Sequence, residues 1–344
     1  MTRSHDRSLR LFACAALLAW MPVCPAQTAS SGEQEPLGIG LESLTYPYPV
    51  QLLTLRMEGR DVKLAFMDIE PSGPANGKTV VLMHGRNFFG AYWKDTIQFL
   101  SAHGYRVVVP DQIGFGKSSK PDVPHSLHVH ADNTKLLLDY LGVKRAVLVG
   151  HSLGGMMAAR FALMFPEYVE RLVLEDPLGL EDYRVKVPYA TREQLAAEAR
   201  KQTRAGIDSQ FKDYFVQWKP EFEVYADVQY RWSLGPESDL IARTAAQTYT
   251  MAYEQPVVYE LPQIRAPTLL IVGEQDRAAL GRSRVAPEVR ATLGLVPELA
   301  RKAVQSIPDA RLVLFPDIGH IPHLEAQDRF DQELLRFLEQ PAGR

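Results

Sequence analysis

The stretch Arg145–Phe165 reads RAVLVGHSLGGMMAARFALMF, a short apolar run, a glycine-rich turn and a longer apolar run. The first run has the length and β-branched content of a buried strand, and the last has the length of a helix. Between them lies Gly150–Gly154, GHSLG, which has the form G-x-S-x-G. In a sharp strand-to-helix turn, this sequence holds the serine hydroxyl clear of the sheet. We therefore predict that Ser152 is a nucleophile, rather than part of a turn without chemistry.

Other short apolar runs alternate with longer amphipathic stretches along the chain. Several runs are almost continuously apolar, as expected for strands that are buried on both faces of a parallel sheet. The alternation predicts an α/β fold, a doubly wound and mostly parallel β-sheet covered by helices. The expected strands are Val62–Ile69, Lys78–His84, Tyr105–Pro110, Arg145–Val149, Arg171–Leu174, Thr268–Val272 and Ala310–Phe315. The expected helices between them include Asn87–His103, His130–Leu141 and Leu153–Phe165.

One long segment interrupts the alternation. From about Leu178 to Leu261 no buried strand is expected, and the sequence is charged, helical in pattern and rich in aromatic residues. We predict a helical cap over the carboxyl ends of the strands, where such sheets bind ligands. The alternative is that the aromatic residues pack a small core of the insertion itself. The predicted organisation is a signal peptide (1–26), an α/β core (27–177 and 263–344) and a cap (178–262).

The first 26 residues resemble a secretory signal. Arg3, Arg7 and Arg10 precede the apolar run Leu11–Val23, and small residues then lead to Ala26. The run is too short to span a bilayer, so we expect cleavage near Ala26 and export to the periplasm or the medium, with no stable membrane span. A retained N-terminal anchor and lipidation are the alternatives. The following residues, from Gln27 to about Leu41, are polar and are expected to form a mobile lead-in.

Composition excludes several classes of protein. Of 344 residues, 46% are hydrophobic and 23% are charged, which is ordinary for a globular protein and excludes disordered and coiled-coil readings. A net charge of −3 gives no basic surface, so nucleic acid is not an expected partner. Both cysteines, Cys14 and Cys24, lie in the predicted signal. The mature chain would then contain no disulfide, cysteine nucleophile or thiolate metal site.

A serine nucleophile needs a general base. His320 follows the expected strand Ala310–Phe315, in FPDIGH, and therefore lies at the same edge of the sheet as Ser152. We predict that His320 is the base. His323, three residues further on, is the second choice, and it is expected rather to flank the pocket or to be exposed. His103 belongs to a helix-to-strand turn and is not a candidate.

The base needs an orienting carboxylate. Asp276 follows the expected strand Thr268–Val272 in the turn GEQD, and it is the predicted acid. Glu274 in the same turn and Asp176 at the end of the preceding strand are the alternatives. The order Ser152, Asp276, His320 along the chain is the order found in α/β-hydrolases.

An acyl-transfer enzyme also needs hydrogen-bond donors for the oxyanion. One expected donor is the backbone N–H of Leu153, next to the nucleophile. The other is the backbone N–H of Arg86, which follows a strand in LMHGRN. For the Arg86 side chain, pairing with an acid is favoured over contact with an anionic substrate.

His125, His128 and His130 fall in a proline-flanked stretch, PHSLHVH. Imidazoles are common metal ligands, but no carboxylate stands at helical ligand spacing, so a solvated loop leading into a helix is the favoured interpretation. Sequences of the forms G-x-G-x-x-G and G-x-x-x-x-G-K-[ST] are missing, so nucleotide binding has no support. We expect no metal and no cofactor.

Together these motifs resemble the α/β-hydrolase superfamily. The resemblance covers nearly the whole mature chain: HG-x after the third strand, DQIGFGKS (Asp111–Ser118) after the fourth, the elbow GHSLGG, and GEQD and GH closing the triad. Within the superfamily the chain is similar to capped enzymes, which include esterases, lactonases and carbon–carbon bond hydrolases. The resemblance implies this fold, a cap and no cofactor.

Ser152, the serine of the GHSLG turn, narrows the set of enzyme classes that the resemblance allows. Epoxide hydrolases and haloalkane dehalogenases of this fold use aspartate there, since a serine would form an inert ether. We therefore expect an exported serine hydrolase that cleaves a small carboxylic ester or lactone, with water as the second reactant. The alternatives are a carbon–carbon bond hydrolase, whose oxyanion loop is usually rich in Gly or Ser, a prolyl-type aminopeptidase, a cofactor-independent oxygenase and a ligand receptor with a hydrolase pocket.

Overall fold

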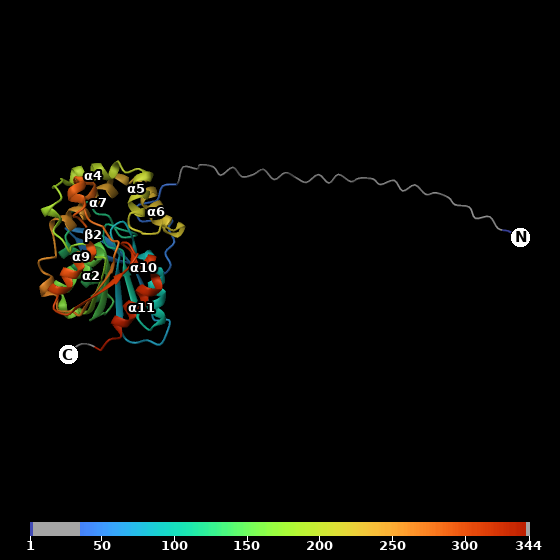
Figure 1. Cartoon of the computed structure of the whole chain (residues 1–344), viewed down its shortest axis with the longest axis horizontal. Helices are drawn as coiled ribbons and strands as arrows, with labels where there is room; N and C mark the ends of the chain where they lie inside the picture. The colour runs from blue at the N-terminus through green and yellow to red at the C-terminus, as the bar shows by residue number, and fades with distance from the viewer. Residues whose placement is uncertain (3–34, 342–344) are drawn as a thin grey trace. The chain divides into compact units, whose positions relative to one another are not determined.

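The computed structural model describes residues 1–2 and 35–341. The predicted signal peptide, its cleavage site and both cysteines lie outside the described residues. From Glu35 onward the chain forms one compact unit, and Figure 1 shows its elements in chain order from blue to red. Within the described residues, no helix is both long and apolar enough to cross a membrane.

An eight-stranded sheet forms the centre of this unit, in the order β1-β2-β4-β3-β5-β6-β7-β8. The pairs β1–β2 and β2–β4 are antiparallel, and the remaining neighbours are parallel. The predicted doubly wound, mostly parallel sheet is therefore confirmed. The strands are β1 Val50–Met57, β2 Arg60–Ile69, β3 Thr79–Met83, β4 Arg106–Pro110, β5 Ala146–His151, β6 Val169–Glu175, β7 Thr268–Gly273 and β8 Ala310–Phe315.

Strand β1 was not predicted from the sequence. Its residues (VQLLTLRM) are mostly exposed or half-buried, and only Leu55 and Met57 are buried. A strand at the antiparallel edge of a sheet needs one apolar face only, so it lacks the continuous apolar run that marks the central strands.

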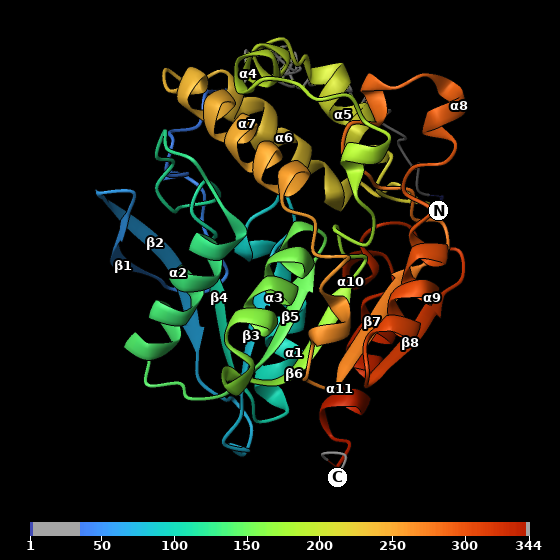
Figure 2. The same ribbon diagram turned by 90° about the vertical axis from the view of Figure 1, so that its left-hand side faces the viewer.

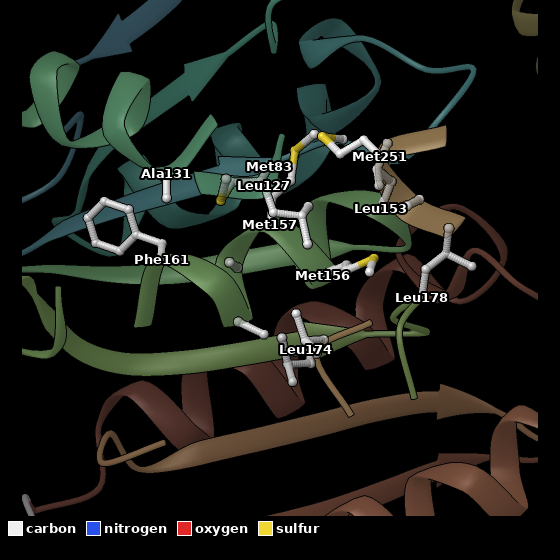
Figure 3. Close-up of a cluster of buried hydrophobic side chains, with 14 of the residues drawn as sticks. Met83, Leu127, Ala131, Leu153, Met156, Met157, Phe161, Leu174, Leu178 and Met251 are labelled. Carbon is white, nitrogen blue, oxygen red and sulfur yellow. The ribbon is translucent and has the colours of Figure 1, made fainter. Parts of the chain in front are cut away.

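Helices cover both faces of the sheet, and alternate residues of each strand point to opposite faces. On one face Val81 and Leu148 belong to a cluster with α2 Leu127–Tyr140, α3 Leu153–Met164 and α9 Val296–Ser306. On the other face Val80 and Val147 pack with α1 Lys94–Ala102 and α11 Gln327–Leu338. Figure 3 shows part of the first cluster, in which Met156 of α3 lies near Leu174 of β6, whereas Phe161 lies farther along the helix.

Two predicted helices have different bounds. The stretch Asn87–His103 contains a 3₁₀ turn, Gly90–Trp93, before α1 begins at Lys94. Helix α2 begins at Leu127 rather than His130, because the Ser126 side chain accepts a hydrogen bond from the Val129 N–H and caps the helix.

Between β6 and β7 the structure contains helices and no strand, in residues 178–262. The helices are α4 Arg192–Arg200, α5 Arg204–Lys212, α6 Glu223–Ser233 and α7 Ser238–Glu254. Figure 2 shows them as a layer above the α/β core. Two short helices follow β7 along the chain, α8 Pro287–Arg290 and α10 Pro322–Glu325.

For Glu35–Leu41, the expectation of a mobile lead-in is wrong. Leu37 and Leu41 are buried, with 3% and 0% of their surface exposed. The Leu37 N–H donates to the Arg231 carbonyl at 3.1 Å, and the Trp232 indole donates to the Gly38 carbonyl at 3.0 Å. This segment therefore packs against the end of α6. It was expected to be mobile because the stretch from Gln27 to Leu41 is polar, but Leu37 and Leu41 anchor it.

Candidate active site

Ser152 lies in the turn between β5 and α3, with φ 54° and ψ −118°. A non-glycine residue with positive φ costs roughly 1–3 kcal/mol and persists only where the surroundings hold it. Here the Ser152 N–H donates to the Glu175 carbonyl at 3.0 Å, and the Ser152 carbonyl accepts from the Leu178 N–H at 3.0 Å. The backbone of β6 and the residues after it thus holds the strained turn.

The two glycines of the elbow have no room for a side chain. A Cβ at Gly150 would overlap the carbonyl oxygen of Gly154, and one at Gly154 would overlap the carbonyl oxygen of Met83. The close packing of α3 against β3 and β5 therefore requires glycine at both positions, as the sequence indicated.

The three residues predicted to form a triad lie together. His320 Nε2 is 2.9 Å from Ser152 Oγ, and His320 Nδ1 is 2.9 Å from Asp276 Oδ2. Each residue follows a strand, Ser152 after β5, Asp276 after β7 and His320 after β8, and all three are buried. With its proton on Nδ1, His320 donates to Asp276 and accepts the Ser152 hydroxyl proton on Nε2. This is the arrangement that activates a serine.

The backbone of His320 is fixed from two sides. Its N–H donates to the Tyr214 carbonyl at 2.7 Å, and its carbonyl lies 2.8 Å from Nε2 of His151, which can donate to it. The Tyr214 ring, on the segment between α5 and α6, lies 5.3 Å from the His320 ring. The helical insertion thus contacts the base directly.

The competing acids lie in different places. Glu274 is half-buried and lines a separate surface hollow with Arg277 and Arg301, so it does not reach His320. Asp176 is fully buried, and both of its oxygens are 3.2 Å from the Gly273 N–H. Burial raises the pKa of Asp176 well above its usual value, and the neighbouring Asp276 carboxylate raises it further. A protonated Asp176 would donate to Asp276 and support it.

Asp176, Asp276 and His320 bring their ligand atoms within 4.8 Å of one another, the one group in the described part of the chain with metal-binding spacing. Two of the three already form the hydrogen-bonded relay to Ser152. The arrangement therefore suits proton transfer.

His323 is not exposed. It is fully buried, its Nδ1 lies 2.9 Å from the carboxylate of Glu175, and its ring stacks on Trp93 at 3.9 Å. Glu175, the last residue of β6, was not singled out from the sequence. Its signal was the acidic pair Glu175-Asp176 directly after a buried strand, where charged residues need partners.

The two expected oxyanion donors flank the serine. A Cβ at Gly85 would be 3.1 Å from Cβ of Ser152, so the turn carrying Arg86 lies against the nucleophile. The Gly85 N–H donates to the Tyr92 hydroxyl at 2.9 Å, which holds this turn. Within residues 35–341, the backbone N–H groups of Arg86 and Leu153 donate to no protein acceptor. Both are thus available to a ligand.

The expected acid partner of the Arg86 side chain is not found among the described residues. The guanidinium instead lies over the ring of Tyr249, 5.6 Å from its centroid. The favoured interpretation, a salt bridge, is therefore wrong.

The expectation of a solvated loop is wrong for His125 and His130. Both are buried, and His125 Nδ1 lies 3.0 Å from His130 Nε2. Burial lowers the pKa of His125 to about 4 and that of His130 well below its usual value, so both rings are neutral. His128 is exposed, as expected for a solvated residue.

This fold and this arrangement of serine, histidine and aspartate define a hydrolase of the α/β class. The sequence profile of the alpha/beta hydrolase fold family matches residues 78–327, and the chain belongs to that family.

Several known proteins are similar to the chain. A probable hydrolytic enzyme from Pseudomonas aeruginosa PAO1 is 41% identical, with a TM-score of 0.87 over 89% of this chain and 99% of the other. An esterase from Thermogutta terrifontis is 25% identical, with a TM-score of 0.62 over 84% and 98%. A 2-hydroxy-6-oxononadienedioate/2-hydroxy-6-oxononatrienedioate hydrolase from Comamonas testosteroni is 29% identical over 76% of this chain and 88% of its own.

Proposed function

We propose that this protein is a serine hydrolase that cleaves a small carboxylic ester or lactone through an acyl-enzyme. The observation that carries the proposal is the buried relay from Ser152 through His320 to Asp276, with 2.9 Å at each step. The free backbone N–H groups of Arg86 and Leu153 beside the serine support it, as does the similarity to an esterase.

In the first step His320 Nε2 takes the Ser152 proton while Oγ attacks the substrate carbonyl. The N–H groups of Arg86 and Leu153 stabilise the oxyanion. His320 then protonates the leaving alcohol oxygen, and the C–O bond breaks. In the second step His320 takes a proton from water, which attacks the acyl-enzyme carbonyl. His320 then returns this proton to Ser152 Oγ as the bond from the acyl carbon to Oγ breaks and the acid leaves. Asp276 holds the imidazole and stabilises its protonated form throughout.

The test is the initial rate on p-nitrophenyl esters from acetate to decanoate, with Ser152→Ala as the control. We expect turnover that disappears in the variant, with a chain-length optimum that reports the size of the pocket. If folded wild-type protein turns over none of these esters, the proposal is wrong, and a peptidase or receptor role gains weight.

Carbon–carbon bond cleavage is the second candidate, because the Comamonas testosteroni relative is named as a hydrolase of a 2-hydroxy-6-oxo dienedioate. Against it, the oxyanion loop reads Arg86-Asn87-Phe88-Phe89, without the Gly- or Ser-rich sequence usual for such enzymes. Loss of the absorbance of a 2-hydroxy-6-oxo dienoate, by wild type but not by Ser152→Ala, would favour this candidate.

We also propose that the protein is exported, because residues 1–26 have the basic start and the short apolar run of a secretory signal. Expression of the full chain in a bacterium should give a product that begins at Gln27 in the periplasmic fraction. A matched version that lacks residues 2–26 should stay in the cytoplasm. A periplasmic product with an intact N-terminus would contradict cleavage and favour an anchor.

A further inference from the structure

A cavity of about 450 Å³ lies between the helical insertion and the turn that follows β3. Arg86 and Asn87 contribute from that turn, and the rest of the wall comes from residues of α4, α5, α6 and α7 and their connections. This volume is within the range that holds small-molecule ligands.

Three arginines line the cavity, and two of them are paired with acids. Arg200 lies 2.7 Å from Asp239, and Arg204 lies 2.8 Å from Asp208 and 3.0 Å from Asp227. Arg86 has no carboxylate within 4 Å in the described part of the chain. Among the three arginines of the cavity wall, Arg86 is therefore the one that no carboxylate of the described residues contacts.

Arg86 is unfavourably placed without an anion. The residue as a whole is half-buried, but its Nε is buried and has no hydrogen-bond partner, and burial lowers the pKa of the guanidinium. Arginine nonetheless stays charged in proteins, and a partly desolvated cation without a counter-ion is destabilising. The ring of Tyr249 compensates only in part, since a cation–π contact contributes about 0.5–2 kcal/mol.

Tyr249 also fixes the direction of this charge. Ile241, Ala242 and Ala245 of α7 line the cavity, and Tyr249 lies one turn beyond Ala245 on the same face of the helix. The guanidinium over its ring is therefore held on the cavity side of α7. Ser152 is not among the residues that line the cavity, but Gly85, the residue before Arg86, lies against Ser152.

We propose that the Arg86 side chain binds a carboxylate of the substrate, so that the enzyme prefers esters or lactones that carry a free carboxylate close to the scissile carbonyl. This inference rests on the proposed function and deepens it. One unbalanced guanidinium matches one carboxylate, which it binds through two parallel hydrogen bonds. A phosphate dianion would need a second cation, and both other arginines of the cavity are already neutralised.

The test compares methyl hydrogen glutarate with methyl pentanoate, which has a methyl group in place of the carboxylate. The measured quantity is the ratio of their kcat/KM values, because any effect of a substitution on the oxyanion hole cancels in the ratio. We expect a ratio above one for the wild type and a fall of about tenfold or more in Arg86→Gln, as for the loss of a hydrogen bond to a charged group.

Arg200→Gln is the matched control, because it removes the same charge from the same cavity wall but from an arginine that is paired with Asp239. Its ratio should stay within about twofold of the wild type. Arg86→Lys should restore part of the ratio, since lysine keeps the charge but loses the two-point geometry. An equal fall in Arg86→Gln and Arg200→Gln, or none in Arg86→Gln, would overturn the inference.

Binding separates this inference from the proposed function. Calorimetry with methyl hydrogen glutarate should show binding to Ser152→Ala and at least tenfold weaker binding to Ser152→Ala combined with Arg86→Gln. If no ester is hydrolysed but this difference is seen, the proposed function fails and the carboxylate site stands. If esters are hydrolysed but Arg86→Gln does not change the affinity for methyl hydrogen glutarate, the carboxylate site is wrong and the proposed function stands.

Discussion

At the scale of single residues, Ser152 hydrogen-bonds to one base among residues 35–341, and within that range the base has one carboxylate partner. Removal of either reacting group should therefore abolish acyl-enzyme formation. We predict that Ser152→Ala and His320→Ala each lower kcat by a factor of about 10⁴ or more. Steady-state kinetics on the best ester of the series will measure this. Either variant keeping a tenth of the wild-type rate would contradict the assignment.

Asp276 and Asp176 should respond differently to the same substitution. Burial and the charge of Asp276 raise the pKa of Asp176, so we expect its carboxyl to be protonated in the working enzyme, a form that asparagine resembles. Asp176→Asn should therefore lower kcat less than about tenfold, whereas Asp276→Asn should lower it by about 10³–10⁴ through loss of the correct His320 tautomer. A larger loss for Asp176→Asn would reverse the two roles.

The sequence was sufficient to place these residues because each follows a recognisable buried strand, and the carboxyl ends of parallel strands share one edge. It was not sufficient for the pairing of Glu175 with His323, which lie 148 positions apart and meet only when β6 and α10 are packed. The partner of Arg86 was misjudged for the same reason, because ion pairs depend on which side chains the fold brings together.

At the scale of elements, the local hydrophobic pattern identified the central strands. It did not identify β1, whose residues are only partly buried. It also failed at the start of α2, where tertiary packing buries polar residues that the sequence pattern places in solvent. There the stretch PHSLHVH reads as a polar loop, yet His125 and His130 are buried as a hydrogen-bonded pair. Their neutral state makes this element sensitive to acid.

We predict that this histidine pair destabilises the protein below neutral pH. The folded pKa of His125 is about 4, below the unfolded value of about 6.5, so only the unfolded chain takes up a proton between these values. Stability is full above pH 6.5 and falls as the pH drops towards 4. Urea unfolding at pH 7.5 and 5.0 should show a smaller loss for His125→Gln than for wild type. Identical losses would contradict the prediction.

At the scale of the whole molecule, the helical insertion is held from two directions. On one side the Tyr214 carbonyl accepts a hydrogen bond from the His320 N–H. On the other side the segment Glu35–Gly38, which precedes the sheet in the chain, is hydrogen-bonded to Arg231 and Trp232 of α6. The Glu35 carbonyl accepts from the Arg231 side chain at 2.7 Å, and the Leu37 carbonyl lies against Gly235 at the end of α6. Because this contact joins segments almost 200 residues apart, no local pattern could have predicted it.

The packing of Leu37 against this end of α6 should contribute to the stability of the whole molecule. Leu37 is 3% exposed, and truncation of a buried leucine to alanine costs about 2–5 kcal/mol. Leu37→Ala should lower Tm by about 3 °C or more, since at about 2.1 cal/mol/K per residue 1 kcal/mol corresponds to roughly 1.5 °C in a domain of about 300 residues. Leu52→Ala is the control, because Leu52 on β1 is 55% exposed and the same truncation should change Tm little. Equal shifts in calorimetry would mean that Glu35–Gly38 lies on the surface of the molecule without stabilising it.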